Sequence, residues 1–306
     1  MTDTLPSKPY YRVRMWALFA SGADKAVILR RGPRTHYQLI DWDLRRDVFK
    51  PGQWMRGHVW LCDLSPSGDR LLYWAHQYAP SAHWRRALAE LQRRATRESP
   101  YDPQTTETRN RSPKRRQTRR KVPRYMRETG KPPAEPRWGS AVRRNEGVWT
   151  AISRPPFFSA LAIWPSFGHW TGGGMFLSEN EIVLQDDNVT PKQNVPVPAS
   201  FAIHSSFAPE FRNKALTPNA WRMCKLDPVL RDSIAVALKK AGAAWIEWMA
   251  PRKNGDLLFA CDGRIYRLAK WQDVTPEEYL AGAKDLADFR WARFEKVAPP
   301  DRAMQW

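Results

Sequence analysis

The sequence predicts a mainly β fold with a few helices, built from meandering antiparallel sheets. A propeller is one arrangement such sheets take, and an α+β fold is the alternative. Short runs of β-branched and aromatic residues alternate with turns rich in Pro and Gly. The 16 tryptophans supply large side chains for a core or for an aromatic binding face. Residues 149–184 concentrate both signals, because prolines interrupt this stretch and it turns at Gly172–Gly174.

Strands are predicted wherever an apolar run lies between turn signals. Residues 10–78 are expected to form a β-meander. Its strands, and those of the later chain, are predicted at 25–31, 37–44, 59–64, 71–75, 201–204, 245–249, 257–261 and 264–268. Turns are expected at Lys50–Gly52 and Ser65–Asp69, where Pro and Gly stand in turn positions. Asp262–Gly263 is a two-residue hairpin signal.

Helices are predicted at 81–94, 228–241 and 276–288, where apolar residues recur at helical spacing. Asp227 and Pro228 are a cap and a first-turn residue for the second helix, and Gly242 is its stop. Thr275 and Glu278 have the spacing of a capping box for the third helix.

The segment 95–138 differs from the rest of the chain. It lacks apolar periodicity and carries many Pro and Arg residues, so it is expected to be a disordered basic insertion. Three parts follow: residues 1–94 as an N-terminal β-meander with a helix, this insertion, and residues 139–306 as a Trp-rich β core with two helices. The first and third parts are expected to pack as one domain.

Three strings resemble the strand ends and turns of WD-type and related β-propeller blades. Gly68–Tyr73 and Gly255–Phe259 nearly repeat each other, and Leu39–Leu44 contains a Trp-Asp pair. In those families a strand ends in Trp-Asp, and a Ser-Pro-Asp-Gly turn opens another strand. Ser65–Gly68 departs from that turn by one residue, and the spacing lacks the fixed period of about 40–45 residues.

A second resemblance lies in Trp149–Pro156, which reads WTAISRPP. This string is similar to a motif in a family of bacterial proteins to which no function is attached. The resemblance implies a bacterial source and a coherent fold.

Charge is the most informative feature for function. The net charge is +19, and residues 85–144 hold nineteen Lys and Arg against six Asp and Glu, which places +13 there and +6 on the remainder. Arginines interleaved with aromatic residues suit phosphate contact and base stacking. The predicted nucleic-acid-binding residues are Arg109, Arg111, Lys114, Arg115, Arg116, Arg119, Arg120, Lys121, Arg124 and Arg127. An acidic protein is the alternative partner, and a solvated insertion without a partner stays open as well.

Cysteine usage and hydropathy indicate the compartment. Cys62, Cys224 and Cys261 match no metal motif, which favours a reducing environment and predicts no metal or cofactor. No apolar run approaches the roughly 20 residues of a membrane span, so a cytoplasmic protein without membrane contact is expected.

Two short motifs have a chemical and a structural interpretation. Asp41 and Asp43 face the same side of a strand and could hold Mg²⁺, but Arg45 and Arg46 beside them favour a strand-end turn. Gly172–Gly174 precedes an apolar run that is typical of a strand, whereas a phosphate loop would lead into a helix. A turn or bulge is therefore expected there.

Other polar groups are scattered. Glu179, Glu181, Asp186 and Asp187 are an acidic concentration that could bind a cation or the basic segment, with a solvated loop as the simpler interpretation. His58, Cys62 and Asp63 lie close in sequence without a second cluster to complete a metal site.

No motif identifies a reaction, so the sequence favours a non-enzymatic β-rich binding scaffold with an Arg-rich arm that contacts nucleic acid. Two alternatives stay open: an enzyme whose site is assembled from distant residues such as Asp41, Asp43 and His58, and an interaction module for an acidic protein.

Overall fold

The computed structural model describes residues 12–32, 35–76, 148–165, 172–186, 189–193, 196–211 and 226–306. They belong to one compact unit made of residues 1–78 and 148–306. The helix predicted at 81–94, the insertion predicted at 95–138 and the ten predicted nucleic-acid-binding residues lie outside the described residues.

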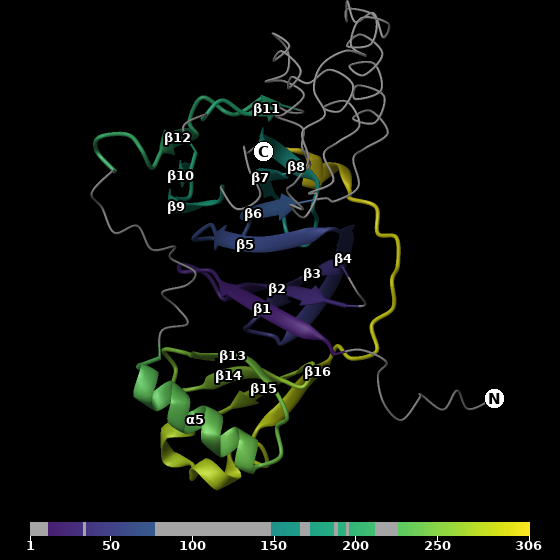
Figure 1. Ribbon diagram of the computed structural model, residues 1–306, viewed down its shortest axis with the longest axis vertical. Helices are drawn as coiled ribbons and strands as arrows, with labels where there is room; N and C mark the ends of the chain where they lie inside the picture. Colours follow the sequence, from purple (N-terminus) through teal and green to yellow (C-terminus); the bar gives the residue numbers. More distant parts are fainter. Residues whose placement is uncertain are drawn as a thin grey trace, which may run out of the picture. The chain divides into compact units, whose positions relative to one another are not determined.

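The described residues form four sheets and one α-helix (Figure 1), which confirms the mainly β prediction. Sheet A holds, in order, β1 (Arg14–Phe19), β2 (Lys25–Arg31), β3 (His36–Asp43) and β4 (Val48–Arg56). Sheet B has the order β11 (Lys192–Gln193), β8 (Ala160–Pro165), β7 (Val148–Ser153), β6 (Leu71–His76) and β5 (His58–Leu64). Sheet C has the order β12 (Ala202–Ser205), β10 (Glu181–Leu184) and β9 (Gly174–Ser178). Sheet D holds β13 (Ile246–Pro251), β14 (Leu257–Cys261), β15 (Arg264–Leu268) and β16 (Lys284–Asp288). Neighbouring strands are antiparallel except for β10 and β12, which are parallel.

Sheet A packs between two other sheets, and its inner strand β2 is buried on both faces. Ala26 and Ile28 belong to an apolar cluster shared with sheet D, whereas Val27 and Leu29 belong to one shared with sheet B. Successive side chains of a strand point to opposite faces, so both sets of positions must be apolar. The uninterrupted apolar run of this strand follows from that requirement.

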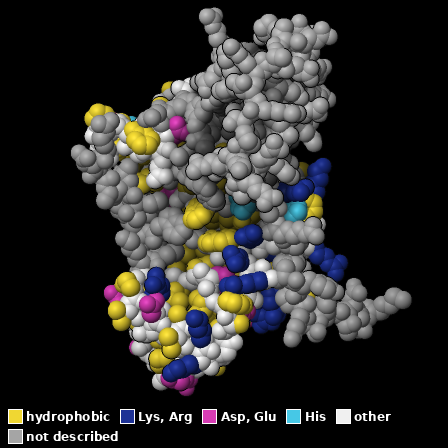
Figure 2. Space-filling view, viewed as in Figure 1, with side chains coloured by type: hydrophobic (Ala, Val, Ile, Leu, Met, Phe, Trp, Pro, Cys, Tyr) yellow, Lys and Arg dark blue, Asp and Glu magenta, His cyan; other side chains and the backbone are white. Residues whose placement is uncertain are grey.

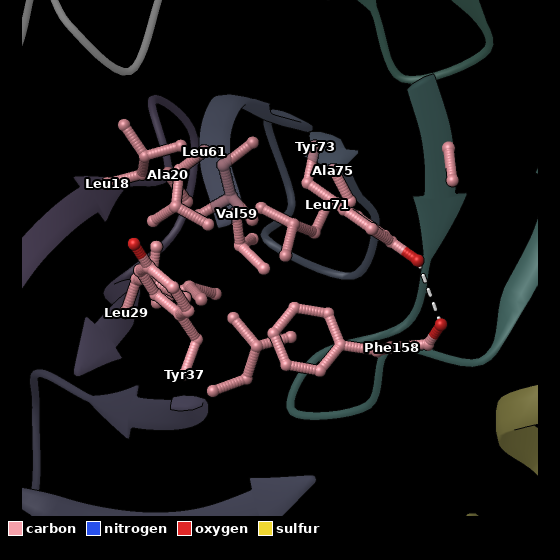
Figure 3. Close-up of a cluster of buried hydrophobic side chains, with 14 residues drawn as sticks. Leu18, Ala20, Leu29, Tyr37, Val59, Leu61, Leu71, Tyr73, Ala75 and Phe158 are labelled. Carbon is pink, nitrogen blue, oxygen red and sulfur yellow. Dashed lines mark hydrogen bonds between the residues drawn. The ribbon is translucent and has the colours of Figure 1, made fainter. Parts of the chain in front are cut away.

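The cluster between sheets A and B surrounds Tyr73 and Phe158 (Figure 3), and the Tyr73 hydroxyl donates a 2.8 Å hydrogen bond to the carbonyl oxygen of Phe158. A further cluster containing Ile152 and Phe176 joins sheets B and C. Contacts therefore run from sheet D to A, from A to B and from B to C. A closed propeller would also need a junction between C and D, so the propeller resemblance stays a prediction.

Elements with strong local signals are confirmed, and the eight predicted strands are present to within two residues at each end. The hairpin between β14 and β15 turns through Asp262 and Gly263, whose φ angles of 52° and 78° suit a type I′ turn. Helix α5 (Pro228–Lys240) begins after Asp227, whose side chain accepts the amide N–H groups two and three residues on at 3.0 and 3.2 Å. Its Ile234 and Leu238 pack on sheet D.

The turn predicted at Lys50–Gly52 is wrong, because these residues lie inside β4. This strand is at the edge of sheet A, next to an irregularity in its pairing with β3, and a proline is tolerated there. Gly52 is required by a close contact: a Cβ atom at this position would lie 2.0 Å from the carbonyl oxygen of Pro156. Gly52 therefore belongs to a strand and lies where this strand contacts the loop that contains Pro156.

The helix predicted at 276–288 is also wrong. Only Pro276–Glu278 is helical, as a 3₁₀ turn, and Thr275 makes no side-chain cap hydrogen bond. Residues 284–288 instead form β16, which pairs with β15 and completes sheet D. Pairing with an available sheet edge outweighs the local helical pattern.

The segment 289–306 contacts sheets A, B and C after the chain leaves sheet D. The fully buried Arg30 of sheet A donates hydrogen bonds to the carbonyl oxygens of Phe289 and Ala292 at 2.8 and 3.2 Å. Near the end, Arg154 donates to the carbonyl oxygen of Gln305 at 2.7 Å, and Trp306 packs in the cluster between sheets B and C. This segment, together with the apolar clusters, fastens the sheets to one another.

Candidate functional site

A groove of about 490 Å³ lies between sheets A and D. Three turns form it: the β1–β2 turn, the start of the β3–β4 turn and the β13–β14 turn. Four of its lining residues are cationic and two are acidic. The lining residues are Ala20, Ser21, Gly22, Ala23, Asp24, Leu44, Arg45, Arg252, Lys253, Asn254, Asp256 and Arg267. Figure 2 shows Lys and Arg side chains gathered around the middle of the described surface.

Arg267 of β15 is held in place by sheet A. Its Nη2 donates to the carbonyl oxygen of Leu44 at 2.9 Å and to the carboxylate of Asp47 at 2.6 Å. Its Nη1 lies 3.4 Å from the carboxylate of Asp256, which also accepts a 2.9 Å hydrogen bond from the side-chain amide of Asn254. The two carboxylates neutralise this guanidinium, so it adds little net charge to the groove. Its hydrogen bonds to Leu44 and Asp47 join sheet D to sheet A.

Arg252, in the β13–β14 turn, forms an ion pair with a single carboxylate, and that carboxylate is largely exposed. Its guanidinium lies 3.2 Å from the carboxylate of Asp24 and 5.6 Å from the centre of the Phe19 ring. The Arg252 side chain is 16% exposed, whereas that of Asp24 is 64% exposed. The cation is thus fixed at the groove, and its acidic partner extends into solvent.

Arg45 and Lys253 are exposed, and neither takes part in an ion pair with another described residue. The residues that line the groove carry a net charge of +2, because four cations stand against Asp24 and Asp256; Asp47, which pairs with Arg267, does not line it. Such an arrangement favours an anionic ligand.

The β1–β2 turn that forms one wall of the groove is also fastened to sheet B. The amide of Gly22 donates to the carbonyl oxygen of Pro66 at 2.9 Å, and Lys25 forms an ion pair with Asp69. The groove wall is therefore held from the side opposite the cavity, which favours a preformed site.

Asp41 and Asp43 lie at the end of β3, and the contacts of Asp43 support the strand-end turn interpretation. The Asp43 carboxylate accepts the amide N–H groups of Arg45 and Arg46 at 3.0 and 3.1 Å, as in a strand-end turn. Burial raises the pKa of the Asp41 carboxyl, and the charges of nearby lysines partly oppose this. No group of three or more His, Cys, Asp or Glu among the described residues is arranged to hold a metal ion.

His58 lies far from that acidic pair. Its ring centre is 6.5 Å from the ring of Tyr37, which is four strand residues, or about 13 Å, from Asp41. Burial and the charge of Arg31 lower the pKa of His58. The structure therefore does not bring together the three residues named for the enzyme alternative.

The neighbours of His58 have structural roles. Burial raises the pKa of the Cys62 thiol to about 12, so the thiol is a poor nucleophile at neutral pH. The fully buried Asp63 accepts the amide N–H of Phe176 at 2.9 Å and so fixes β9 against sheet B.

Gly172–Gly174 leads into β9, as the turn interpretation expected. The amide of Gly173 donates to the Thr150 hydroxyl at 2.7 Å, and a Cβ atom on Gly174 would lie 2.2 Å from the carbonyl oxygen of Val183. Close backbone approach explains Gly174, and the φ angles of 128° and 94° favour glycine at Gly172 and Gly173.

In the acidic group, Glu179 and Glu181 interact with other residues of the chain. Glu179 accepts hydrogen bonds from the amide and hydroxyl of Ser67 at 2.9 and 2.8 Å. Glu181 lies 3.0 Å from a ring nitrogen of His204. Asp187 lies outside the described residues.

Comparison of the chain with protein-family models, curated proteins and solved structures found no match. None of the helices in the described ranges is both long and apolar enough to cross a lipid bilayer.

Sequence reasoning missed the groove. It identified Arg45 only as a neighbour of Asp43, and it assigned no role to Arg252, Lys253 or Arg267. One sequence feature pointed to part of the groove. The turn that opens the near repeat Gly255–Phe259 forms one of its walls.

Proposed function

We propose that the protein is a non-enzymatic scaffold that binds nucleic acid through basic side chains. The observation that carries this proposal is the pair of exposed cations at the groove, Arg45 and Lys253, which no acidic group in the described ranges neutralises. Contacts between such cations and phosphates release condensed counterions, which supplies most of the free energy of non-specific binding.

The basic segment 85–144 is the second part of the proposal. Its net charge of +13 makes it the strongest source of phosphate contacts in the sequence, and it contains more Arg than Lys. Arginine is the better residue for forked contacts with phosphate and for stacking on bases. Phosphate contacts carry no base information, so the binding is expected to be tolerant of sequence.

Fluorescence anisotropy with single- and double-stranded oligonucleotides at several salt concentrations tests the proposal. The logarithm of the affinity should fall with the logarithm of the salt concentration, with a slope of about −0.7 to −0.9 for each phosphate contact. An arm variant and a groove variant should each bind more weakly and show a flatter slope. The arm variant replaces Arg115, Arg116, Arg119 and Arg120 with Ala, and the groove variant replaces Arg45 and Lys253 with Gln.

The matched control is Lys239→Gln with Lys240→Gln. These two exposed lysines at the end of α5 carry the same charge as the groove pair but do not line the groove. The control should therefore bind more tightly than the groove variant. Absence of binding by the wild-type protein at low salt, or an unchanged slope in both the arm and groove variants, would overturn the proposal and leave the acidic-protein alternative.

A further inference from the structure

We propose that the groove between sheets A and D binds a single phosphomonoester group, with Arg45 and Lys253 neutralising it and Arg252 exchanging Asp24 for a phosphate oxygen. This inference deepens the proposed function and rests on the same site. It names the ligand chemistry, which a free mononucleotide or the 5′-phosphorylated end of a nucleic acid could supply.

The charge of the groove matches a phosphomonoester. Arg45 and Lys253 provide two positive charges that no described acidic residue pairs with. A phosphomonoester carries about −1.5 to −2 at pH 7. An internal phosphodiester carries only one negative charge and would leave part of this positive charge uncompensated.

Arg252 is the cation best placed to fix the orientation of the group. Packing near Phe19 and low exposure hold its guanidinium in the groove wall. Its partner Asp24 is 64% exposed, and solvent screening of an exposed carboxylate weakens its ion pairs. A phosphate can therefore displace the Asp24 carboxylate at small cost and accept the forked hydrogen bonds that guanidinium groups form.

The acidic residues around the groove restrict how much negative charge it accepts. Asp24 and Asp256 line it, and Asp69 lies beside the same β1–β2 turn through its ion pair with Lys25. A nucleic-acid strand carries one charge for about every 3.4 Å along its axis, so a continuous strand would bring further phosphates close to these carboxylates. A terminal phosphate avoids that repulsion.

The size and apolar lining of the groove fit the remainder of a nucleotide-sized ligand. Its volume of about 490 Å³ lies within the usual range of small-molecule sites. The partly exposed Ala23 supplies apolar lining next to the basic residues, whereas Ala20 and Leu44 are buried. A neutral sugar could pack there while the phosphate contacts the guanidinium and ammonium groups.

Isothermal titration calorimetry with AMP and adenosine, on the full chain, tests the ligand chemistry. AMP should bind at least tenfold more tightly than adenosine, and Arg45→Gln with Lys253→Gln should remove that preference. The control Lys239→Gln with Lys240→Gln should keep it. Asp24→Asn should tighten AMP binding by up to about fivefold, because it removes the competing carboxylate, whereas a merely structural role for Asp24 would predict weaker binding. Equal affinity for AMP and adenosine, or weaker AMP binding by Asp24→Asn, would overturn the inference.

Anisotropy with 5′-phosphorylated and 5′-hydroxyl oligonucleotides separates the two sources of the phosphate. Preference for the phosphorylated end, with competition by AMP, supports a nucleic-acid end as the ligand. Binding of AMP without binding of either oligonucleotide would support the groove inference with a free mononucleotide and overturn the proposed function. Equal binding of both oligonucleotides, without competition by AMP, would retain the proposed function and overturn the inference.

Discussion

Glu247 should make the stability of the protein decrease as pH rises toward neutrality. Its side chain projects from β13, at the edge of sheet D, and both carboxylate oxygens are buried without a hydrogen-bond partner among the described residues. Burial raises the pKa of this carboxyl to about 7, with a further contribution from the charge of Asp262, while the charge of Arg12 acts in the opposite direction. The protonated form is therefore the one that suits the folded state.

The direction of the effect follows from the two pKa values. The carboxyl titrates near 4.5 in the unfolded chain and near 7 in the folded protein. Between these values the folded protein holds a proton that the unfolded chain releases, so the free energy of unfolding falls as pH rises through this window and levels off above it. One pKa unit corresponds to about 1.4 kcal/mol, which sets a limit of about 3 kcal/mol. Although both oxygens are buried, the Glu247 residue as a whole is only partly buried, so nearby solvent screens the charge and we expect roughly 2 kcal/mol.

Glu247→Gln removes the titration while keeping the shape of the side chain. The variant should be more stable than the wild type by no more than about 1 kcal/mol at pH 5 and by roughly 2 kcal/mol at pH 8. Urea unfolding followed by tryptophan fluorescence at both pH values measures the difference, and Glu278→Gln, at an exposed site, is the control for loss of one carboxylate. The same stability difference at pH 5 and pH 8, or a variant less stable than the wild type at pH 8, would refute the reasoning.

Substitutions at three positions test the packing and the helix cap. Arg30→Met should lower the free energy of unfolding by about 3 kcal/mol in urea titrations, since it leaves buried carbonyl oxygens without donors. A loss below 1 kcal/mol would contradict the role of segment 289–306 in holding the sheets together. Gly52→Ala should cost about 2–3 kcal/mol in the same assay through its clash with Pro156, and a neutral effect would argue against that contact. Asp227→Ala should cost about 1 kcal/mol and Asp227→Asn much less, as measured by thermal unfolding, because asparagine also caps helices; equal losses would argue against capping.

Local chemistry explains which elements the sequence could predict. Asp262–Gly263 and Asp227–Pro228 each determine a backbone conformation within a few residues, so the hairpin and α5 were predictable. At 276–288 the local pattern indicates a helix, but the unpaired edge of β15 offers a ladder of hydrogen bonds to a strand. Only the assembled sheet contains that information.

The candidate site depends on contacts between distant parts of the chain. Arg252 and Asp24 are 228 positions apart, and Arg267 and Asp47 are 220 apart. No local spacing connects such pairs, because the packing of sheet D on sheet A brings them together. The charge of the sequence predicts an anionic partner, which stays a prediction, but no local pattern predicts the residues of the groove.

The near repeat in the sequence has a structural explanation that also accounts for the position of the groove. The turn before Gly68–Tyr73 contacts the β1–β2 turn from sheet B, and the turn that opens Gly255–Phe259 contacts it from sheet D through Arg252. On the sheet B side the backbones meet directly, since a Cβ atom on Gly22 would lie 3.2 Å from the carbonyl oxygen of Pro66. On the sheet D side the contact runs through the long side chain of Arg252, which keeps the two turns apart. The cavity therefore forms between sheets A and D, and a cation that a ligand can reach lies in its wall.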